Sequence, residues 1–264
     1  MDREGGPLVT FFVPCLNEEG NVCRTIDTIA EVMAGRRESY EILVVDDASG
    51  DGSVAEVLDR RRRHPDLRLE LVRNAAHQGL GVNYDKAAQL ANGVYFMMVC
   101  GDAAEPPETL RRILDRLGRA DMVVPYFGSW DARGPLRRAV SQVFIHLINL
   151  FSGTRLRYYN GPVLHRTVNI RRWGGTTYGF GYQAELLCRL LNEGMSVIEV
   201  QIANNARCCG GSKAFTRKNL ISVMGTCWRI LWARLTQQVH RAVPVARRDI
   251  VPAESEQKVT SLHA

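Results

Sequence analysis

Residues 44–53, VVDDASGDGS, decide how this chain folds. The stretch starts as the end of an apolar run, which is typical of a buried strand, and finishes in the small and polar residues that open a helix. A capped turn between the two explains Ser49 or Asp51, since either can be the helix N-cap. It does not explain Asp46 and Asp47, because adjacent carboxylates repel unless a donor-rich partner such as a base N–H, a ribose or a metal faces them.

The order of strand and then helix repeats through the first half of the chain. We expect strands at 8–14, 41–45, 67–72, 94–99 and 121–126, and helices at 22–33, 51–63, 82–91 and 106–117. Asn17 is the expected N-cap of the first helix, with the two glutamates after it in the first turn. This alternation predicts an α/β fold with a mostly parallel, Rossmann-like sheet flanked by helices. Ligands of such sheets bind beyond the carboxyl ends of the strands.

Two amphipathic helices mark the second half of the chain. They are expected at 137–151 and 219–235, and each has an apolar stripe at helical spacing. A helix at 182–192 and strands at 163–165 and 197–202 lie between them. The stripe residues are Val140, Val143, Phe144, Leu147, Ile148 and Phe151 in the first helix, and Leu220, Met224, Cys227, Trp228, Leu231 and Leu235 in the second.

Composition and charge narrow the range of partners. The net charge of +6 and the pI near 9.1 favour an anionic partner. The sequence lacks a basic face interleaved with aromatic residues, so we expect no nucleic acid partner. Trp228 and Trp232, beside Arg229 and Arg234, suit a helix that lies at a membrane surface, and the same helix suits a packing or homo-oligomer interface equally well.

The sequence predicts a cytoplasmic protein that is not secreted. Its seven cysteines show neither CxxC nor zinc-ligand spacing, which favours reduced thiols. The first residues lack a basic segment followed by an apolar one, and neither apolar helix approaches the roughly 20 apolar residues of a membrane span. We therefore expect no transmembrane helix and, at most, a peripheral position on the inner face of a membrane.

Another strand end with a carboxylate lies in the stretch MMVCGDAAEPPE at 97–108. Asp102 follows the strand, with Glu105 and Glu108 nearby. Mg²⁺ needs few protein ligands, because phosphates and water complete its shell, so one aspartate can suffice. Cys100 is a soft ligand and suits such a hard ion poorly. The sequence therefore predicts a Mg²⁺ or Mn²⁺ site at Asp102.

Basic residues around a Gly-Gly pair form a further motif, RCCGGSKAFTRKN at 207–219. Glycines let backbone N–H groups approach a phosphate, and Arg207 and Lys213 supply charge. A solvated basic loop is the plain alternative, but the Gly-Gly-Ser-Lys core favours a phosphate site. Arg137 and Ser141 are four residues apart and share a helix face, which is either a solvated edge or part of a second anionic pocket.

Together these stretches resemble family 2 glycosyltransferases of the GT-A fold, and most closely the dolichyl- or polyprenyl-phosphate sugar transferases. The resemblance spans residues 8–225 and rests on FFVPCLNEEGNV, VVDDASGDGS, RNAAHQGLGVNYDKAAQLANGVYFMMVCGD, GFGYQAELL and RCCGGSKAF, in that order. We then expect a GT-A glycosyltransferase domain at 1–215, an amphipathic helix that is interfacial or dimerising at 216–238, and a flexible tail at 239–264.

The resemblance also implies roles for individual residues. Those implied for the nucleotide-sugar are Pro14, Asn17, Glu18, Asp46 and Asp47; for the metal, Asp102; and for the phosphates of donor and acceptor, Arg137, Ser141, Arg207 and Lys213. Two departures from the family pattern stand out. The family's Asp-x-Asp is Cys100-Gly101-Asp102, which lacks the first carboxylate. The acceptor-side segment at 157–162 reads RYYNGP where the family is often Asp-rich, and Asn160 is its candidate for contact with the acceptor.

The implied reaction is an inverting transfer, in which an acceptor attacks the sugar C1 and Mg²⁺ or Mn²⁺ on Asp102 stabilises the departing diphosphate, with Arg207 as a second catalytic residue. A polyprenyl phosphate is already an anion and needs no strong base. A hydroxyl on a small molecule or glycan needs one, and Glu185 or Asp131 are the candidates. A non-catalytic nucleotide-sugar binding module that has lost its metal carboxylate is the remaining alternative.

Overall fold

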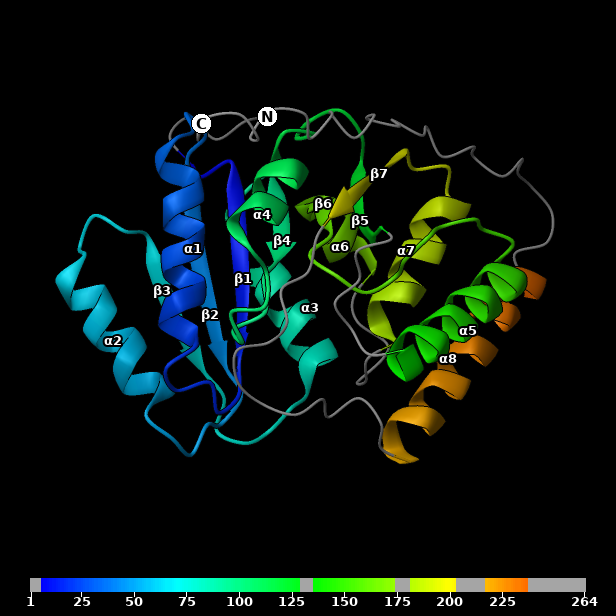
Figure 1. The fold of residues 1–264 in the computed structure, drawn as a ribbon, viewed down its shortest axis with the longest axis horizontal. Coiled ribbons are helices and arrows are strands. Elements are labelled where there is room, and N and C mark those ends of the chain that lie inside the picture. Colours follow the sequence, from blue (N-terminus) through cyan, green and yellow to red (C-terminus); the bar gives the residue numbers. More distant parts are fainter. Residues whose placement is uncertain (1–5, 129–134, 174–180, 203–216, 237–264) are drawn as a thin grey trace, which may run out of the picture.

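The structure, a computed structural model, describes residues 6–128, 135–173, 181–202 and 217–236. Its strands form one seven-stranded sheet in the order β3-β2-β1-β4-β6-β5-β7 (Figure 1). Strand β6 is antiparallel to β4 and β5, whereas the other neighbours are parallel, so the mostly parallel sheet is confirmed. The strands are β1 Val9–Cys15, β2 Tyr40–Asp46, β3 Leu69–Arg73, β4 Tyr95–Met98, β5 Met122–Phe127, β6 Leu164–Arg166 and β7 Val197–Ile202.

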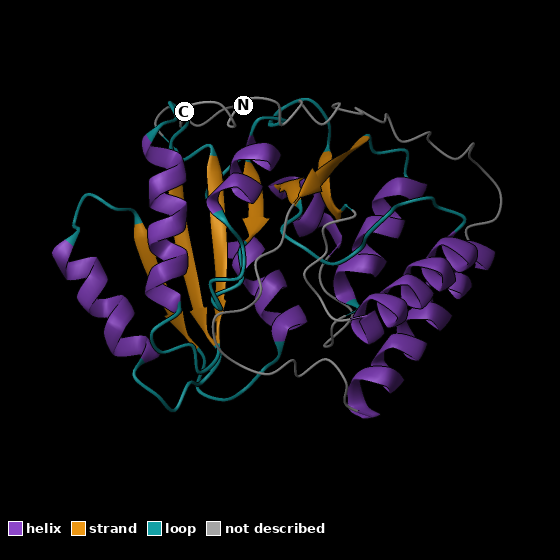
Figure 2. Ribbon diagram, in the orientation of Figure 1, coloured by secondary structure: helices purple, strands orange, loops and turns teal. Residues whose placement is uncertain are grey.

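Helices flank this sheet (Figure 2). They are α1 Val22–Ala34, α2 Ser53–Arg63, α3 Leu80–Leu90, α4 Pro107–Leu114, α5 Pro135–Ser152, α6 Thr167–Trp173, α7 Tyr182–Asn192 and α8 Arg217–Thr236. The sequence did not predict α6, which follows β6 without a loop. Among the described residues, no helix has the length and apolar character that crossing a membrane requires. The tail expected at 239–264 lies outside the described residues.

Alternate residues of each strand supply two separate cores. On β1, Phe11 and Val13 belong to the core that contains residues of α1 and α4, while Phe12 between them belongs to the core that contains residues of α3 and α7. Figure 1 shows α1 on the near face of the sheet. Because both faces are buried, the central strands are almost continuously apolar, which made them recognisable in the sequence.

The predicted apolar stripes of α5 and α8 are only partly buried. The core contains Ile145 and Ile148 of α5, and Cys227 and Ile230 of α8. Both predicted helices are confirmed, but helical periodicity shows only that a helix is amphipathic and not how much of its apolar arc a neighbour covers. The stripe residues that the structure leaves exposed are Val140, Val143 and Leu147 of α5, and Trp228 and Leu235 of α8.

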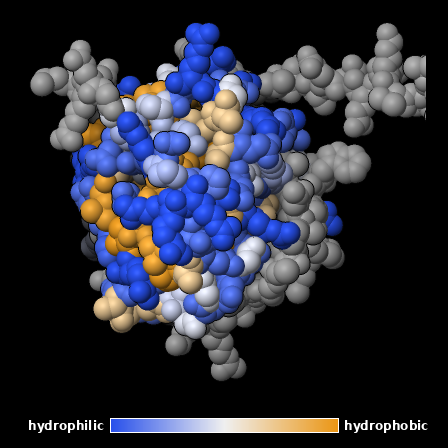
Figure 3. Space-filling view, turned by 90° about the vertical axis from the view of Figure 1, so that its left-hand side faces the viewer, coloured by the Kyte–Doolittle hydropathy of each residue, from blue (hydrophilic) through white to orange (hydrophobic). Residues whose placement is uncertain are grey.

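Helix α2 ends in four consecutive arginines at the edge of the molecule that faces the viewer in Figure 3, where hydrophilic side chains predominate. Every one of these guanidinium groups pairs with a carboxylate. The pairs are Arg60–Asp27, Arg61–Glu70, Arg62–Asp59 and Arg63–Asp59. Exposed ion pairs contribute little to stability. Because the guanidinium groups already pair with carboxylates of the chain, we interpret this basic run as a solvated surface and not as a binding site.

His165 on β6 is fully buried, and neither of its ring nitrogens has a hydrogen-bond partner. Burial lowers the pKa of His165 to about 3. In the unfolded chain the pKa returns to about 6.5. Between these two values the unfolded chain binds a proton that the folded chain does not, so the free energy of unfolding falls as the pH falls.

We expect His165→Leu to flatten the pH dependence of the free energy of unfolding between about pH 6.5 and 3, by up to about 1.4 kcal/mol per pH unit. Urea unfolding followed by circular dichroism at a series of pH values measures this slope. His64→Leu changes an exposed histidine and is the matched control, which should keep the wild-type slope. A wild-type slope in His165→Leu would mean that the buried imidazole is protonated in the folded state.

Candidate functional site

The loops that follow β1, β2 and β4 meet at one edge of the sheet, because these three strands are parallel neighbours. Among the described residues, the non-glycine residues with positive φ are Asn17 at 55°, Ala48 at 65° and Ala103 at 54°, one in each of these loops. A left-handed backbone at alanine costs about 1–2 kcal/mol. Strained backbone of this kind concentrates at functional sites, so these loops are the place to look for one.

Reciprocal hydrogen bonds join the loop after β1 to the loop after β2. The Asn17 carboxamide oxygen accepts from the Gly50 backbone N–H at 2.9 Å, and the Ser49 hydroxyl accepts from the Asn17 backbone N–H at 2.9 Å. The buried Ser53 hydroxyl accepts from the Glu18 backbone N–H at 2.9 Å. Side chains of each loop therefore satisfy the backbone of the other.

Glu19 and Asp51 continue this exchange. The Glu19 carboxylate accepts from the Gly52 backbone N–H at 2.9 Å, and the Asp51 carboxylate accepts from the Glu19 backbone N–H at 3.0 Å. A Cβ at Gly52 would lie 2.6 Å from the Glu19 carboxylate, so a larger residue there would displace this carboxylate from the Gly52 N–H.

The helix caps predicted from the sequence were wrong for this reason. The N-cap of α1 is Asn21 rather than Asn17, and the two glutamates after Asn17 lie before the helix rather than in its first turn. The N-cap of α2 is Gly52 rather than Ser49 or Asp51. Asn17 and Ser49 bind the backbone of the neighbouring loop instead of their own helix. Asp51 does both, since its carboxylate accepts from the Glu19 N–H of that loop and from the Ser53 N–H at the start of α2.

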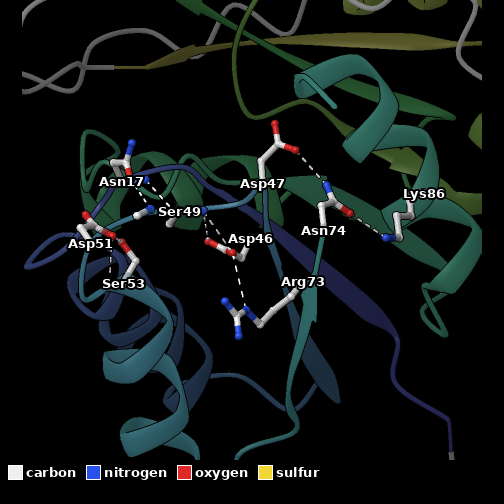
Figure 4. A network of polar contacts seen from close by, with 10 residues as sticks. Asn17, Asp46, Asp47, Ser49, Asp51, Ser53, Arg73, Asn74 and Lys86 are labelled. Carbon is white, nitrogen blue, oxygen red and sulfur yellow. Dashed lines mark hydrogen bonds and ion pairs between the residues drawn. The ribbon is translucent and has the colours of Figure 1, made fainter. Parts of the chain in front are cut away.

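The two aspartates at the end of β2 point in opposite directions (Figure 4). Asp46 is buried, with its carboxylate 3.3 Å from the Ser49 backbone nitrogen and 3.9 Å from the Nε of Arg73. Asp47 points toward Asn74. Successive side chains of a strand alternate, so the mutual repulsion expected from the sequence is relieved by geometry.

The chain itself supplies the donors that Asp47 needs. Its carboxylate accepts from the Asn74 side chain at 2.9 Å, from the backbone N–H groups of Gln78 at 2.8 Å and Gly79 at 2.9 Å, and lies 2.7 Å from His77 Nδ1. Burial alone would raise the pKa of Asp47, but the hydrogen bonds, led by the Gln78 N–H, outweigh it and keep the pKa below its ordinary value. The inference that Asp47 requires an external partner was therefore wrong.

Asn74 connects this carboxylate to α3. Its side-chain nitrogen also donates to the Asn83 side-chain oxygen at 2.7 Å, and its oxygen accepts from Lys86 Nζ at 2.8 Å. Sequence reasoning assigned no role to Asn74, Asn83 or Lys86. The available signal was the position of Asn74 directly after β3, at the same edge of the sheet as Asp46 and Asp47.

The loop after β4 is fixed against β1 and α1. A Cβ at Gly101 would lie 2.6 Å from the Pro14 carbonyl oxygen, so only glycine allows this approach. The Thr25 hydroxyl donates to the Cys100 carbonyl at 3.0 Å and accepts from the Ala103 N–H at 3.1 Å. These contacts place the Cys-Gly-Asp sequence beside the loop after β1.

Cys100, Asp102 and Glu105 bring one ligand atom each to within 4.8 Å of one another. They form the only cluster of three or more potential metal ligands in the part of the chain that the structure describes. Two carboxylates fit Mg²⁺ or Mn²⁺, whereas the thiol is a softer ligand. Glu105 therefore offers the second carboxylate that Cys100 does not.

The segment at 157–162, which the sequence predicts to contact the acceptor, lies at the carboxyl end of β5. The Tyr158 ring contacts Phe127 edge to face, with centroids 4.8 Å apart, and the Arg157 guanidinium lies 4.5 Å from the centroid of Tyr126. Because β5 and β4 are both antiparallel to β6, they end at the same edge of the sheet. Asn160 is partly exposed in this segment.

Glu185 is buried in the first turn of α7 and joins that helix to α8. Its oxygens lie 2.6 Å from Arg189 Nη2 and 3.1 Å from Arg229 Nε. The Tyr182 hydroxyl, also in the first turn of α7, donates to the sulfur of Met98 at the end of β4 at 3.2 Å. The start of α7 thus borders the candidate site, and the role predicted for Glu185 stays a prediction.

Several predicted site residues are placed only in part. Pro14 is partly exposed near the end of β1, and Ser141 is partly exposed on α5. Arg137 lies in α5, but its side chain is outside the described residues. Arg207 and Lys213 lie outside them altogether.

Comparison with known proteins decides the family. The sequence profile of glycosyl transferase family 2 matches residues 10–173, which is more than half of the chain. The chain belongs to glycosyltransferase family 2. This agrees with the placement of the family's motifs at three neighbouring strand ends.

Two curated relatives show how far the similarity extends. Over 221 residues, the chain is 27% identical to polyprenol monophosphomannose synthase of Mycolicibacterium smegmatis. This match covers 76% of this chain and 78% of that protein. Over 105 residues, it is 28% identical to the uncharacterized glycosyltransferase YkcC of Bacillus subtilis. The second match covers 39% of this chain and only 32% of the relative's length.

Solved structures confirm the GT-A fold. Glucosyl-3-phosphoglycerate synthase from Mycobacterium tuberculosis, in complex with Mn²⁺, UDP and glucosyl-3-phosphoglycerate, superposes with a TM-score of 0.63 at 15% identity. The superposition covers 85% of this chain and 81% of the synthase chain. The same enzyme in complex with Mg²⁺ and UDP superposes with a TM-score of 0.63.

We expect Glu105→Gln to weaken Mn²⁺ binding about tenfold, because it removes one of the two carboxylates in the cluster. Electron paramagnetic resonance of unbound Mn²⁺ during a titration measures the affinity without reference to activity. Glu108→Gln is the matched control, since the Glu108 carboxylate already pairs with Arg112 at 2.9 Å. Equal affinities in wild type and Glu105→Gln would exclude Glu105 as a ligand.

Proposed function

We propose that the chain is an inverting glycosyltransferase that moves a sugar from a nucleotide diphosphate-sugar to a polyprenyl phosphate. One acceptor phosphate oxygen forms a bond to the sugar C1, the bond from C1 to the donor diphosphate breaks, and the nucleoside diphosphate leaves. The observation that carries this proposal is the convergence of Asp46, Asp47 and Asp102 at one sheet edge in a family 2 chain. The UDP complexes of the solved neighbour support a nucleotide-sugar donor.

The nucleotide lies in the cradle formed by the loops after β1 and β2. Pro14 at the end of β1, and Asn17 and Glu18 in the loop after it, belong to this cradle. His77 is the exposed partner of Asp47, with 64% of its side chain accessible. A base N–H or ribose hydroxyl can replace His77 at the Asp47 carboxylate without disturbing the buried donors. Asp47 then receives a donor from the ligand in a position that the chain has already oriented.

The phosphates face the basic residues of the second half. Arg137 and Ser141 of α5, and Arg207 and Lys213 of the glycine-containing loop, are the residues we assign to them. Asp102 and Glu105 would hold Mg²⁺ or Mn²⁺, which supplies positive charge beside the diphosphate when bound. Arg207 adds charge that remains in place as the diphosphate departs.

A phosphate acceptor fits the described residues better than a hydroxyl acceptor. A hydroxyl needs a base. Of the two candidates, Glu185 already has its oxygens against Arg189 and Arg229, and Asp131 lies outside the described residues. A lipid phosphate is ionised and attacks without a base. The similarity to polyprenol monophosphomannose synthase, over about three quarters of each chain, supports the same choice and implies a peripheral contact with the membrane.

The decisive test is transfer of labelled sugar from uridine and guanosine diphosphate sugars, with Mn²⁺, to a polyprenyl phosphate in detergent and to hydroxyl acceptors in parallel. We expect product on the polyprenyl phosphate alone. Asp102→Asn should lower the rate by on the order of 100-fold, because charge stabilisation of the leaving diphosphate is lost.

The two alternatives predict other results. A hydroxyl-directed transferase gives product on hydroxyl acceptors and none on polyprenyl phosphate. A non-catalytic binding module is stabilised against heat by a nucleotide-sugar but transfers no sugar, and Asp102→Asn then changes neither property by much. Glu108→Gln, in the same segment as Asp102, controls for nonspecific effects of removing a carboxylate.

A further inference from the structure

Helices α5 and α8 expose most of the large apolar side chains found at the surface of the described residues. Val143 and Leu150 are 60% and 68% exposed, and Trp228 and Trp232 are 64% and 58% exposed. A contiguous exposed apolar patch marks a contact with another molecule or a membrane. The full set on these helices is Val140, Val143, Leu147, Leu150, Trp228, Trp232 and Leu235.

The two helices lie side by side and run in the same direction (Figure 1). The Arg234 guanidinium, near the end of α8, donates to the carbonyl oxygens of Leu150 and Phe151, near the end of α5, at 3.0 and 3.3 Å. The rings of Trp228 and Trp232 stack with centroids 6.3 Å apart. The exposed apolar side chains are therefore carried by one pair of neighbouring helices that is fixed at its end.

Neither helix needs these residues for its own packing. Ile145 and Ile148 of α5 point into the core and are 5% and 0% exposed, while Val143 and Leu150 lie on another side of the same helix. Leaving apolar area in water costs about 25 cal/mol per Å² relative to covering it. An amphipathic helix whose apolar arc is wider than its core contact has a second apolar partner.

The charges of these helices identify that partner. Neither α5 nor α8 contains an Asp or a Glu, and the sequence has none at 132–184 or 200–248. Arg138 and Arg234 are exposed on the pair. A second copy of the chain docked by two-fold symmetry would bring like charges together, whereas an anionic lipid surface is complementary to them.

Tryptophan favours the same partner. Its ring is amphipathic and concentrates at the boundary between lipid headgroups and hydrocarbon. A helix with Trp and Leu on one side and Arg nearby, and too polar to span, lies in the plane of that boundary. The stacked pair Trp228 and Trp232 presents this combination on the outer side of α8.

We propose that α5 and α8 together form a docking surface for an anionic lipid bilayer, with Trp228 and Trp232 inserted at headgroup depth. This inference rests on the proposed function, since a polyprenyl phosphate presents its phosphate at the same depth. Arg137 and Ser141, which we assign to the acceptor phosphate, lie on α5 itself. The surface thus brings the acceptor side of the site to the lipid.

The test is flotation of the full chain with phosphatidylglycerol-containing vesicles and with pure phosphatidylcholine vesicles. We expect the wild type to bind the anionic vesicles. A Trp228→Ser/Trp232→Ser variant should bind them at least about tenfold more weakly. Leu58→Ser, which changes a 44% exposed side chain on α2, is the matched control and should bind like wild type. Arg138→Glu should weaken binding to anionic vesicles without changing the oligomeric state.

Three results would overturn the proposal. A chain that does not float and is monomeric by light scattering covers this surface itself or leaves it bare. A chain that does not float and is a dimer, which Trp228→Ser/Trp232→Ser dissociates, uses the surface for a second copy. Equal loss of binding in Leu58→Ser would show that the effect is not specific to α5 and α8.

Failure of this proposal is distinguishable from failure of the proposed function. A chain that transfers sugar to polyprenyl phosphate in detergent but does not float retains the function and lacks the docking surface. A chain that floats but transfers no sugar to polyprenyl phosphate retains the surface and lacks the lipid acceptor. We expect each variant to fold, because the substituted side chains are exposed. Circular dichroism of each variant tests this.

Discussion

The reciprocal hydrogen bonds between the loops after β1 and β2 are the constraint on which the candidate site depends. In each bond a side-chain oxygen of one segment accepts from a backbone N–H of the other, and the side chains are those of Asn17, Ser49 and Ser53. Parallel register aligns Cys15 with Asp46, so the two loops begin at the same height. Because the bonds run both ways, a shift of either loop breaks hydrogen bonds to backbone N–H groups of both. Such a cradle is already ordered before a ligand arrives, which reduces the entropy lost on binding.

The same edge collects the three strained residues Asn17, Ala48 and Ala103. Other contacts hold each of these loops in place. The Thr25 hydroxyl, for example, hydrogen-bonds to the backbone of Cys100 and Ala103. The strain is therefore maintained by the surrounding hydrogen bonds and by the close approach at Gly101. The opposite half of the sheet differs, since β6 reverses direction and brings the acceptor-side segment to the same edge. One sheet thus brings the segments that we assign to the nucleotide and to the acceptor to the same edge.

Much of the fold could be predicted from the sequence, because strands buried on both faces and helices with one apolar face have clear periods. The bounds of α7 and β7 agree with those expected. Interactions between loops could not be predicted, since a side chain such as Ser49 can bond to its own helix or to a neighbour with equal chemistry. Likewise, Asn74 reaches Asp47 only because β3 pairs with β2. Which side of α5 is exposed depends on the elements that pack against it, and the sequence does not show these.

We propose that Asp47 and the loops beside it bind the nucleotide of the donor. Calorimetric titration of UDP and GDP, with Mn²⁺, into wild type and Asp47→Asn measures this binding. Asp47→Asn should weaken binding of the preferred nucleotide at least about tenfold. Asp121→Asn, at the opposite edge of the sheet where Ser196 satisfies the carboxylate, should bind it like wild type. Unchanged nucleotide affinity in a folded Asp47→Asn variant would show that the Asp47 carboxylate does not bind the nucleotide.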